Sequence, residues 1–281
     1  VMTGSALAYW SGWFDWKVAL LCLLTTVFLQ ILSNIANDYG DHHQGADTQE
    51  RLGPLRGIQK GSISATELKQ AMYGLVAICL LSGGTLIALA YRSLSDVVMF
   101  VVLGVLAVIA AITYTVGHKP YGYRGLGDVS VWLFFGLLGV GGSYYLQAHQ
   151  LSWLVMLPAA STGLLASAVL NINNLRDIEQ DKAVGKYTLA VRLGATKARL
   201  YHCVLVAAAM MGYAIFIGLV YQSAWQWLVG LCYPMLVRHA YGVYRSQAPT
   251  ELRPMLAHMA MLALLANGLF SLGMYLGGTA N

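Results

Sequence analysis

The sequence has little charge for its length. Only 10% of its 281 residues are Asp, Glu, Lys or Arg, whereas 58% are hydrophobic. A soluble domain has about 25% charged and about 45–50% apolar residues, so this apolar excess cannot be buried inside one water-facing globule. No polar linker separates the apolar runs. The composition therefore predicts one polytopic membrane domain that covers residues 1–281.

Several common motifs are also missing. The sequence has no Walker loop, zincin helix or dinucleotide-binding fingerprint. Its four cysteines lie inside apolar runs, without the spacing of a metal site or a disulfide framework. The net charge of +5 would favour nucleic acid on a soluble chain, but here the 17 basic and 12 acidic residues must lie mostly at helix ends. We expect a lipid bilayer as a partner and no nucleic acid.

The apolar runs predict an all-α membrane protein with nine transmembrane helices, the first of them partial. A spanning helix needs about 20 mostly apolar residues. The predicted spans are 1–10, 18–37, 71–91, 97–116, 129–147, 151–173, 203–221, 224–244 and 255–276. Pro234 interrupts the eighth span, and the first has neither a polar flank nor a charged n-region. We therefore expect further residues upstream of the first span.

The basic residues are distributed unevenly between the two sides of the membrane. The loops after the second, fourth, sixth and eighth spans share one side, because an even number of crossings separates them. That side holds 15 of the 17 basic residues, and only Lys17 and Arg92 lie on the other. The positive-inside rule places the basic side in the cytoplasm. Ten of the 12 acidic residues lie there too, which topology does not explain because acidic residues have little influence on orientation. Their gathering indicates a site.

Two acidic motifs end helices on this cytoplasmic side. The first has the spacing i, i+3, i+4, i+7, which puts its polar residues on one helical face: Asn34, Asn37, Asp38 and Asp41. The second, at the end of the sixth span, has the helical spacing i, i+4, i+7, i+11, which again shares one face: Leu170, Asn174, Asp177 and Asp181. Both loops continue to Arg-Leu-Gly, at 51–53 and 192–194, as a weak internal repeat. Since both helices end on one side, we expect the two polar faces to meet across one cavity.

Such a cavity suits a hard divalent cation bound to a diphosphate. Mg²⁺ prefers carboxylate and phosphate oxygens and is usually held by one or two carboxylates, with water and substrate completing its shell. Metal ions that bridge a leaving diphosphate neutralise its developing charge. Asp and Asn are also common as ordinary helix caps, but two matched clusters on one side of a membrane protein favour function.

The loop after the fourth span carries basic and aromatic residues on the same side. Lys119 and Arg124 could clamp a diphosphate or a carboxylate, Arg in a bidentate way. Tyr114, Tyr121 and Tyr123 could line the site. The alternative for all of them is interfacial anchoring, which Tyr, Lys and Arg perform in most membrane proteins.

These motifs resemble those of the UbiA superfamily of intramembrane aromatic prenyltransferases, which carry two Asp-rich motifs on nine helices around a central cavity. The generic features are Asn-Asp-x-x-Asp at 37–41 and Asp-x-x-x-Asp at 177–181. The detail is most similar to the branch that prenylates 1,4-dihydroxy-2-naphthoate in menaquinone synthesis. That resemblance covers residues 32–41, 53–61, 113–117, 120–123, 125–128 and 170–194.

The resemblance implies an activity and a set of site residues. Mg²⁺ would be held by Asp38, Asp41, Asp177 and Asp181, assisted by Asn34, Asn37 or Asn174, and would bind a polyprenyl diphosphate. The allylic cation formed on ionisation would be attacked by the naphthoate ring, and loss of carbon dioxide would give demethylmenaquinone. The candidates for contact with the diphosphate or the naphthoate carboxylate are Arg56, Lys60, Lys119, Arg124, Lys186 and Arg192. The implied location is the bacterial cytoplasmic (inner) membrane, with the site facing the cytoplasm.

The sequence departs from the family pattern in two places. Family members usually begin with a stretch that contains Arg-Pro-Lys-Thr, which this sequence lacks. The superfamily often has a third acid four residues after the second, but position 45 is Gly and the next acid is Asp47. A metal role for Asp47 therefore has weaker support than that of the other four acids.

Other functions fit the sequence less well. Within the family, the acceptor could be 4-hydroxybenzoate, homogentisate or haem, but the loops favour the naphthoate branch. A CDP-alcohol phosphotransferase would carry Asp-Gly-x-x-Ala-Arg, which is absent. A secondary transporter would use inverted repeats with midplane charges, whereas this repeat is parallel and its charges lie at helix ends.

Overall fold

The computed structural model describes residues 1–45 and 57–279, and the described part consists of helices and loops only. The elements in chain order are α1 (Met2–Trp10), α2 (Trp16–His43), α3 (Ala65–Leu89), α4 (Leu94–Thr113), η1 (Tyr121–Arg124), α5 (Gly127–Val131), η2 (Trp132–Gly142), α6 (Ser143–Ala148), η3 (Trp153–Val155), α7 (Met156–Arg176), α8 (Ile178–Ala183), α9 (Leu189–Val220), η4 (Ala224–Cys232), α10 (Tyr233–Arg245) and α11 (Pro249–Leu276).

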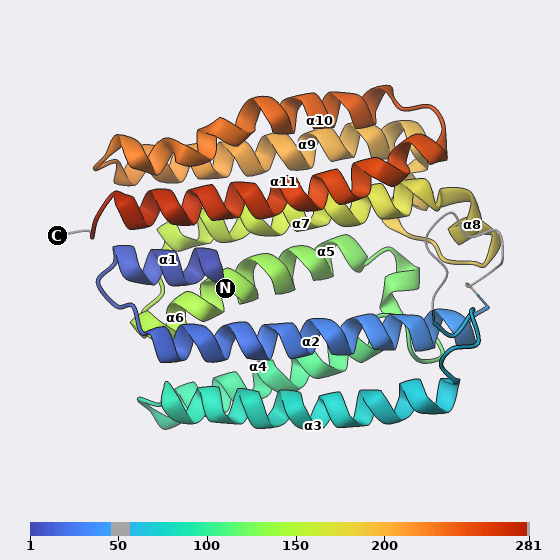
Figure 1. The fold of residues 1–281 in the computed structure, drawn as a ribbon, viewed down its shortest axis with the longest axis horizontal. Helices are drawn as coiled ribbons and strands as arrows, with labels where there is room; N and C mark the ends of the chain where they lie inside the picture. The colour runs from blue at the N-terminus through green and yellow to red at the C-terminus, as the bar shows by residue number, and fades with distance from the viewer. Residues whose placement is uncertain (46–56, 280–281) are drawn as a thin grey trace.

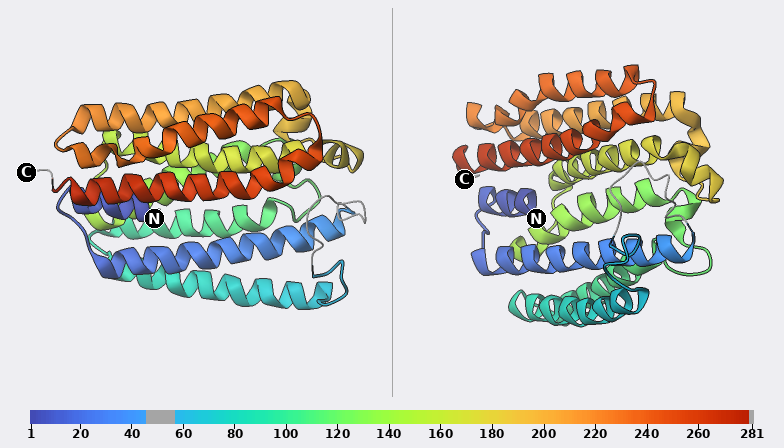
Figure 2. Two further views of the ribbon diagram at one scale, coloured as in Figure 1. Left: turned by 45° about the horizontal axis from the view of Figure 1, so that its top comes forward. Right: turned by 45° about the vertical axis from the view of Figure 1, so that its right-hand side comes forward.

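The long helices run side by side in two groups (Figure 1). Helices α2, α3 and α4 pack on one another, and α7, α9, α10 and α11 form the second group around the largest apolar core. The continuous element α5–η2–α6 and the short α1 lie between the groups, and α1 packs mainly on α11 (Figure 2). The layer between the two groups is therefore where the bundle can hold a cavity.

Among the described residues, seven helical segments are long and apolar enough to cross a membrane: Trp16–His43, Ala65–Leu89, Leu94–Thr113, Gly127–Ala148, Trp153–Arg176, Leu189–Val220 and Pro249–Leu276. They correspond to seven of the nine predicted spans. The other two predictions fall on α1, which has 9 residues, and on the segment from η4 to α10. That segment begins as a 3-10 helix and becomes an α-helix at Tyr233–Pro234, where Pro is tolerated because the first turn needs no backbone donor. The count of nine spans stays a prediction.

The helix of the first motif is longer than its apolar run predicts. Helix α2 continues to His43, six residues past the predicted end at 37, and therefore includes the whole stretch from Asn34 to Asp41. The Asp15 carboxylate caps its start by accepting from the backbone N–H of Lys17, at 2.8 Å. The expectation that these polar residues share a helical face is confirmed.

The span Gly127–Ala148 is not a regular α-helix. Its centre, Trp132–Gly142, is a π-helix that packs on α7. A methyl group on Gly136 would lie 2.6 Å from the Ala159 carbonyl oxygen, so only glycine allows these two backbones to approach so closely. The π-helix is rare in proteins, and where it occurs it is often part of a functional site. This one forms part of the wall of the main cavity described below.

The loops with most of the basic residues lie at one end of the bundle. Helix α2 ends, α3 begins, and α7 and α10 end on the right of Figure 1, where α8 also lies. The other end holds the start of α2 and the C-terminal end of α11. The sequence-based grouping of the loops is therefore confirmed.

Candidate active site

The main cavity has a volume of about 670 Å³ and lies between the two helix groups. Its polar end is lined by residues from α2, from α7 and from the loop after α8: Asn34, Asn37, Asp41, Asn173, Asn174 and Lys186. Most of the remaining wall is apolar and comes from α2, α4, η2, α7 and α11. The cavity therefore has a small polar end and a long apolar body.

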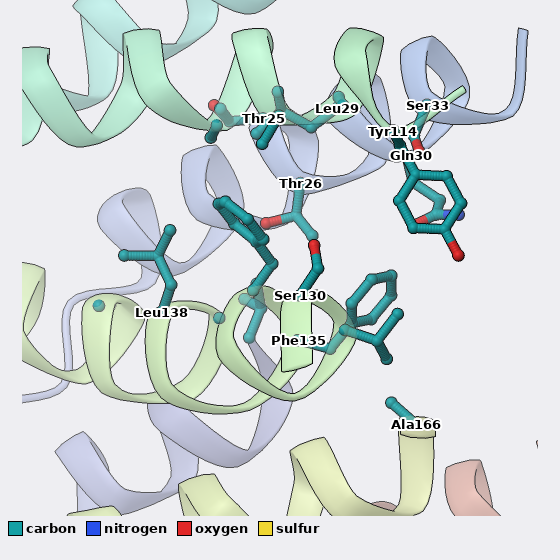
Figure 3. Close-up of a pocket in the computed structure, with 18 of the residues that line it drawn as sticks. Thr25, Thr26, Leu29, Gln30, Ser33, Tyr114, Ser130, Phe135, Leu138 and Ala166 are labelled. Carbon is teal, nitrogen blue, oxygen red and sulfur yellow. The ribbon is translucent and has the colours of Figure 1, made fainter. Parts of the chain in front are cut away.

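Side chains from different elements face this space in Figure 3. Thr26 and Leu29 of α2 lie opposite Ser130 of α5 and Phe135 of η2, while Tyr114 lies at one end of the view. An aliphatic chain fits such a wall, because apolar contact is non-directional and favours any hydrocarbon of suitable width.

The first motif is fixed in place by residues that follow α4. The Asp41 side chain is only 6% exposed, and Tyr123 Oη donates a hydrogen bond to its Oδ1 at 2.7 Å. The Thr115 hydroxyl lies 3.1 Å from Asn37 Oδ1. A methyl group on Gly40 would lie 2.6 Å from the Thr115 carbonyl oxygen, so glycine lets α2 approach this loop. Thr115 and Tyr123 therefore fix the position of the motif on α2.

The second motif spans a break between two helices. Helix α7 ends at Arg176, and Asp177 begins the short α8 that carries Asp181. The Arg176 guanidinium binds both oxygens of Asp177, with Nε at 2.6 Å and Nη2 at 2.5 Å. The same Nη2 donates to Asn173 Oδ1 at 2.9 Å. Arg176 is thus a buried orienting residue that the spacing of the motif did not indicate.

Lys186 and Tyr123 connect the two motifs. Lys186 Nζ lies 3.5 Å from Asp181 Oδ1 and 5.3 Å from the centre of the Tyr123 ring. Tyr123 in turn binds Asp41. A chain of contacts therefore runs from Asp181 through Lys186 and Tyr123 to Asp41, across the polar end of the cavity.

The electrostatics of this end favour a cation. Burial raises the pKa of Asp181 to about 6, Lys186 opposes this shift, and the carboxylates of Asp177 and Asp41 add to it. The carboxylates of the two motifs therefore lie close enough to raise the pKa of Asp181 across this end. A divalent cation between them would reverse the effect, because a bound ion is usually the largest local charge in its site.

The side chains that the structure describes do not form a complete metal cage by themselves. Within residues 1–45 and 57–279, no three His, Cys, Asp or Glu side chains lie close enough to hold a metal ion by themselves. This arrangement fits Mg²⁺, which typically binds through one or two carboxylates while substrate phosphates and water complete its octahedron. The donor set of buried Asp41 and Asp181 with amide oxygens nearby agrees with such a hard cation.

The predicted basic residues divide into separate groups. Lys186 is the one that lines the main cavity in the described part of the chain. A second cavity of about 310 Å³ is lined by Lys119, Arg124 and Arg192, together with His118 and Gln44. Arg192 Nη2 donates to the Arg124 carbonyl oxygen at 3.0 Å, which fixes one wall. Tyr123 also lines this second cavity, and it contacts Asp41 and Lys186, which line the main one.

Several further predicted residues are placed apart from the cavities or are not placed. Lys60 is exposed and lines neither cavity. Arg56 and Asp47 lie outside the described residues. Asp38 and Asp177 are partly exposed and Asp181 is buried, and none of these three predicted ligands lines either cavity.

Two of the predicted tyrosines, Tyr114 and Tyr121, line the main cavity. The Tyr121 hydroxyl donates to the Ala110 carbonyl oxygen at 2.9 Å and lies 3.0 Å from Ser130 Oγ. Burial raises the pKa of Tyr114, and the charge of Asp128 adds to this shift, so Tyr114 stays protonated at neutral pH. Asp128 was not among the predicted site residues, because its motif gave no sign that its side chain would be buried.

Comparisons with known proteins agree with this geometry. The profile of the UbiA prenyltransferase family matches residues 1–273. A 1,4-dihydroxy-2-naphthoate octaprenyltransferase of Haemophilus influenzae is 60% identical over 279 residues, which are 99% of this chain and 91% of that protein. The protein of the same name from Escherichia coli is 53% identical over 276 residues, which are 98% of this chain and 90% of that protein.

A solved structure shows the same fold. A UbiA homologue from Archaeoglobus fulgidus, bound to GPP and Mg²⁺, superposes with a TM-score of 0.60 at 16% identity, over 96% of this chain and 94% of that one. The family profile extends over nearly the whole chain, and two relatives exceed half identity over almost their full length. The chain therefore belongs to the UbiA prenyltransferase family.

Proposed function

We propose that this protein transfers a polyprenyl group from a polyprenyl diphosphate to 1,4-dihydroxy-2-naphthoate, with release of diphosphate and carbon dioxide. The product is demethylmenaquinone, formed in its reduced state. The names of the relatives at 60% and 53% identity support this choice of acceptor. The observation that carries the proposal is the shape of the main cavity, whose polar end and apolar body match a diphosphate and its isoprenoid tail.

Mg²⁺ is the proposed cofactor, and the two motifs are its proposed ligands. Asp41 is buried and lines the polar end, and Asp181 is buried 3.5 Å from Lys186, which also lines it. Asp38 and Asp177 are partly exposed. Arg176 occupies two of the roughly four lone-pair directions of Asp177, so this carboxylate can still reach a cation. When bound, the ion neutralises the charge that develops on the leaving diphosphate.

The protein side chains orient the donor and exclude water. Asn37 and Asn174 offer amide groups to the polar end, and Lys186 offers a cation beside it. The apolar wall keeps water from the allylic cation, which would otherwise be hydrolysed. The site holds the allylic cation and the acceptor ring in line, so their reaction becomes effectively unimolecular and its entropic barrier falls.

The acceptor reaction has a simple balance. The bond between the donor's C1 and its diphosphate oxygen breaks, and C1 forms a bond to the ring carbon that bears the carboxylate. Loss of that carboxylate as carbon dioxide restores the aromatic ring, so no proton is released overall. Lys119, Arg124 and Arg192 around the second cavity are the proposed contacts for the anionic acceptor on its way in.

The proposed location is the bacterial cytoplasmic membrane, with nine crossings and the site on the cytoplasmic side. The gathering of basic loops at the end of the bundle that carries the motifs supports this orientation. Membrane-impermeant labelling of single cysteines provides a check. A cysteine introduced at exposed Lys197 should react only in opened cells, whereas one at exposed Arg92 should react in intact spheroplasts.

The activity itself is tested with purified protein, Mg²⁺ and a polyprenyl diphosphate, offering 1,4-dihydroxy-2-naphthoate or 4-hydroxybenzoate and reading products by mass spectrometry. We expect a naphthoate adduct that has lost the mass of carbon dioxide. An adduct of the benzoate alone would keep the prenyl transfer but overturn the acceptor. Absence of any adduct would overturn the proposed function.

A further inference from the structure

The net charge of the chain is concentrated in its C-terminal helices. Residues 189–276, which form α9, η4, α10 and α11, hold six basic residues and one acidic residue. The rest of the chain holds the other eleven basic and eleven acidic residues, so the C-terminal helices account for the whole net charge of +5. The positive-inside rule explains on which side these cations lie, but not why acids accompany the cations elsewhere and are almost absent here.

Five of the six cations have no part in the proposed reaction. Arg192 lines the second cavity. The others line neither cavity and form no ion pair within the described part of the chain: Lys197, Arg199, Arg238, Arg245 and Arg253. The one acid of this group, Glu251, accepts from the backbone N–H of Gln247 at 3.1 Å. These five residues, the C-terminal cations, therefore have no ion-pair partner among the residues that the structure describes.

Cations from α9 and α10 meet where α10 ends. The two helices pack side by side, and this end lies on the right of Figure 1. Arg199 of α9 donates through Nη2 to the carbonyl oxygen of Gln247 at 3.4 Å, two residues past Arg245. Its Nε is buried and has no hydrogen-bond partner within residues 1–45 and 57–279. Buried donors normally have an acceptor, and a phosphate oxygen bound at this end would supply one.

The outward face of α10 combines charge with aromatic and apolar surface. Arg238, Tyr241 and Arg245 are spaced i, i+3, i+7, so they share one helical face, and all three are exposed. The Arg245 guanidinium carbon lies 6.0 Å from the centre of the Tyr241 ring. Met235 and Val237 are 46% and 55% exposed and continue this surface toward the start of the helix. Cations and tyrosine therefore lie near the end of the helix, and exposed apolar side chains follow.

An anionic phospholipid matches this order. Arginine binds a phosphate in a bidentate way, tyrosine is typical of the headgroup level, and acyl chains can continue along the apolar residues. A soluble anion or a nucleic acid would use the cations but not the apolar surface beside them. A zwitterionic lipid balances its phosphate with its own amine, whereas an anionic lipid leaves a charge for the protein to pair. Basic clusters at the cytoplasmic ends of spanning helices bind such headgroups.

We propose that Arg199, Arg238 and Arg245 form a binding site for the headgroup of an anionic phospholipid. Arg238 and Arg245 lie about 10 Å apart along the helix axis, so their long side chains can converge on one headgroup. The site lies outside both cavities, in the leaflet next to the end of the bundle that carries the motifs. Lipid binding there is non-covalent and goes beyond prenyl transfer, which it does not require.

The test is native mass spectrometry of the delipidated protein in detergent, titrated with dioleoyl phosphatidylglycerol or with dioleoyl phosphatidylcholine, which has the same tails. Wild type should bind phosphatidylglycerol at least about 10-fold more tightly. Arg238→Gln and Arg245→Gln should each weaken this binding by about fivefold, the factor expected for one arginine near an anionic headgroup. Excess inorganic phosphate should not displace the lipid, because the apolar surface contributes to binding.

The matched control is Lys69→Gln. Lys69 is an exposed cation near the start of α3, in the other helix group but at the same end of the bundle. Its substitution removes the same charge without touching the proposed site, so phosphatidylglycerol should bind as it does to wild type. The midpoint of thermal unfolding in detergent without lipid should be the same for all of these variants, because each substituted side chain is exposed.

Three outcomes would overturn the proposal. Equal affinity of wild type for the two lipids would show that no headgroup charge is recognised. An equal loss in Lys69→Gln and Arg238→Gln would make net charge, not a site, the cause. Displacement by inorganic phosphate would make the site one for a soluble anion. Should Arg238→Gln fail to fold, Arg245→Gln with the same control separates these outcomes. None of them affects the proposed function, which is tested separately by product formation.

Discussion

At the scale of single residues, Tyr123 has an unusual position. Its hydroxyl donates to Asp41, its ring lies under Lys186, and its side chain lines the second cavity. Groups that orient a metal ligand influence metal affinity although they do not touch the ion.

Tyr123→Phe should therefore weaken the response to Mg²⁺ while leaving the fold intact. The ring and its contact with Lys186 remain, but Asp41 loses the hydrogen bond that Tyr123 donates. We expect the half-saturating Mg²⁺ concentration to rise by about 10-fold, measured from initial rates across a Mg²⁺ titration. Tyr73→Phe, at an exposed tyrosine of α3, is the control and should respond as wild type does. An unchanged titration for Tyr123→Phe would contradict this role.

Residue spacing predicted only part of the site. The face of Asn34, Asn37 and Asp41 depends on local helix geometry, so the sequence could predict it, and the structure confirms that these residues share the cavity wall. The contact between Arg176 and Asp177 depends on the helix break between them, and the burial of Asp128 depends on packing between distant segments. Spacing carries no information about either.

At the scale of elements, the apolar runs predicted the existence of the helices correctly, but they did not predict where α2 ends or that part of Gly127–Ala148 is a π-helix. Helix α2 continues through polar residues to His43, beyond the end of its apolar run at residue 37. The π-helical centre of Gly127–Ala148 has no signature in a hydrophobic pattern, since a change from 3.6 residues per turn alters which backbone groups pair, not how apolar the stretch is.

Glycines at helix contacts carry a prediction at this scale. Gly136→Ala should lower the free energy of unfolding by about 1–3 kcal/mol, because its methyl group would meet the α7 backbone and neither helix can yield easily. Gly74→Ala on α3 is the matched control. Its methyl group meets nothing within 4 Å, so it should stabilise the helix by about 0.5–1 kcal/mol.

The measurement is the midpoint of thermal unfolding in one detergent for both variants and wild type. A lower midpoint for Gly136→Ala together with an unchanged or higher one for Gly74→Ala is the expected pattern. Equal midpoints would show that the approach of η2 to α7 is looser than the structure indicates.

At the scale of the whole molecule, two helix groups enclose a cavity that no single helix could form. Its polar end lies where both motifs end their helices, and its apolar body extends along α4 toward the opposite end of the bundle. Family membership and the grouping of the loops at one end were expected from the sequence, and both are confirmed. The shape of the apolar body was not, because it depends on how the groups pack.

The apolar body should set which donors fit. Gly104 lines it and lies ten residues before Tyr114 along α4, about 15 Å from the polar end by helical rise. A Cβ atom there meets no neighbouring atom within 4 Å, so we expect Gly104→Leu to extend into the cavity without distorting the fold. We expect kcat/KM to fall by at least about 10-fold for a long polyprenyl diphosphate, the loss of about 1.4 kcal/mol of binding, and little for geranyl diphosphate.

The control for this substitution is Gly84→Leu, which also has open space around it but lines neither cavity. It should leave the ratio of kcat/KM between long and short donors as in wild type. An equal loss for both donors in Gly104→Leu would mean that the isoprenoid tail takes another path.

The central claim is that the two acidic motifs together hold one Mg²⁺-bound diphosphate, and its most direct test is donor binding rather than turnover. Calorimetric titration of the purified protein with an unreactive thio analogue of a prenyl diphosphate should show binding that requires Mg²⁺. Asp41→Asn and Asp181→Asn should each weaken it by at least about 100-fold, because each removes a ligand rather than a second-sphere contact. Asp15→Asn, at the helix cap of the opposite end, should bind as wild type does. Wild-type affinity in either motif variant, or binding that is independent of Mg²⁺, would contradict the claim.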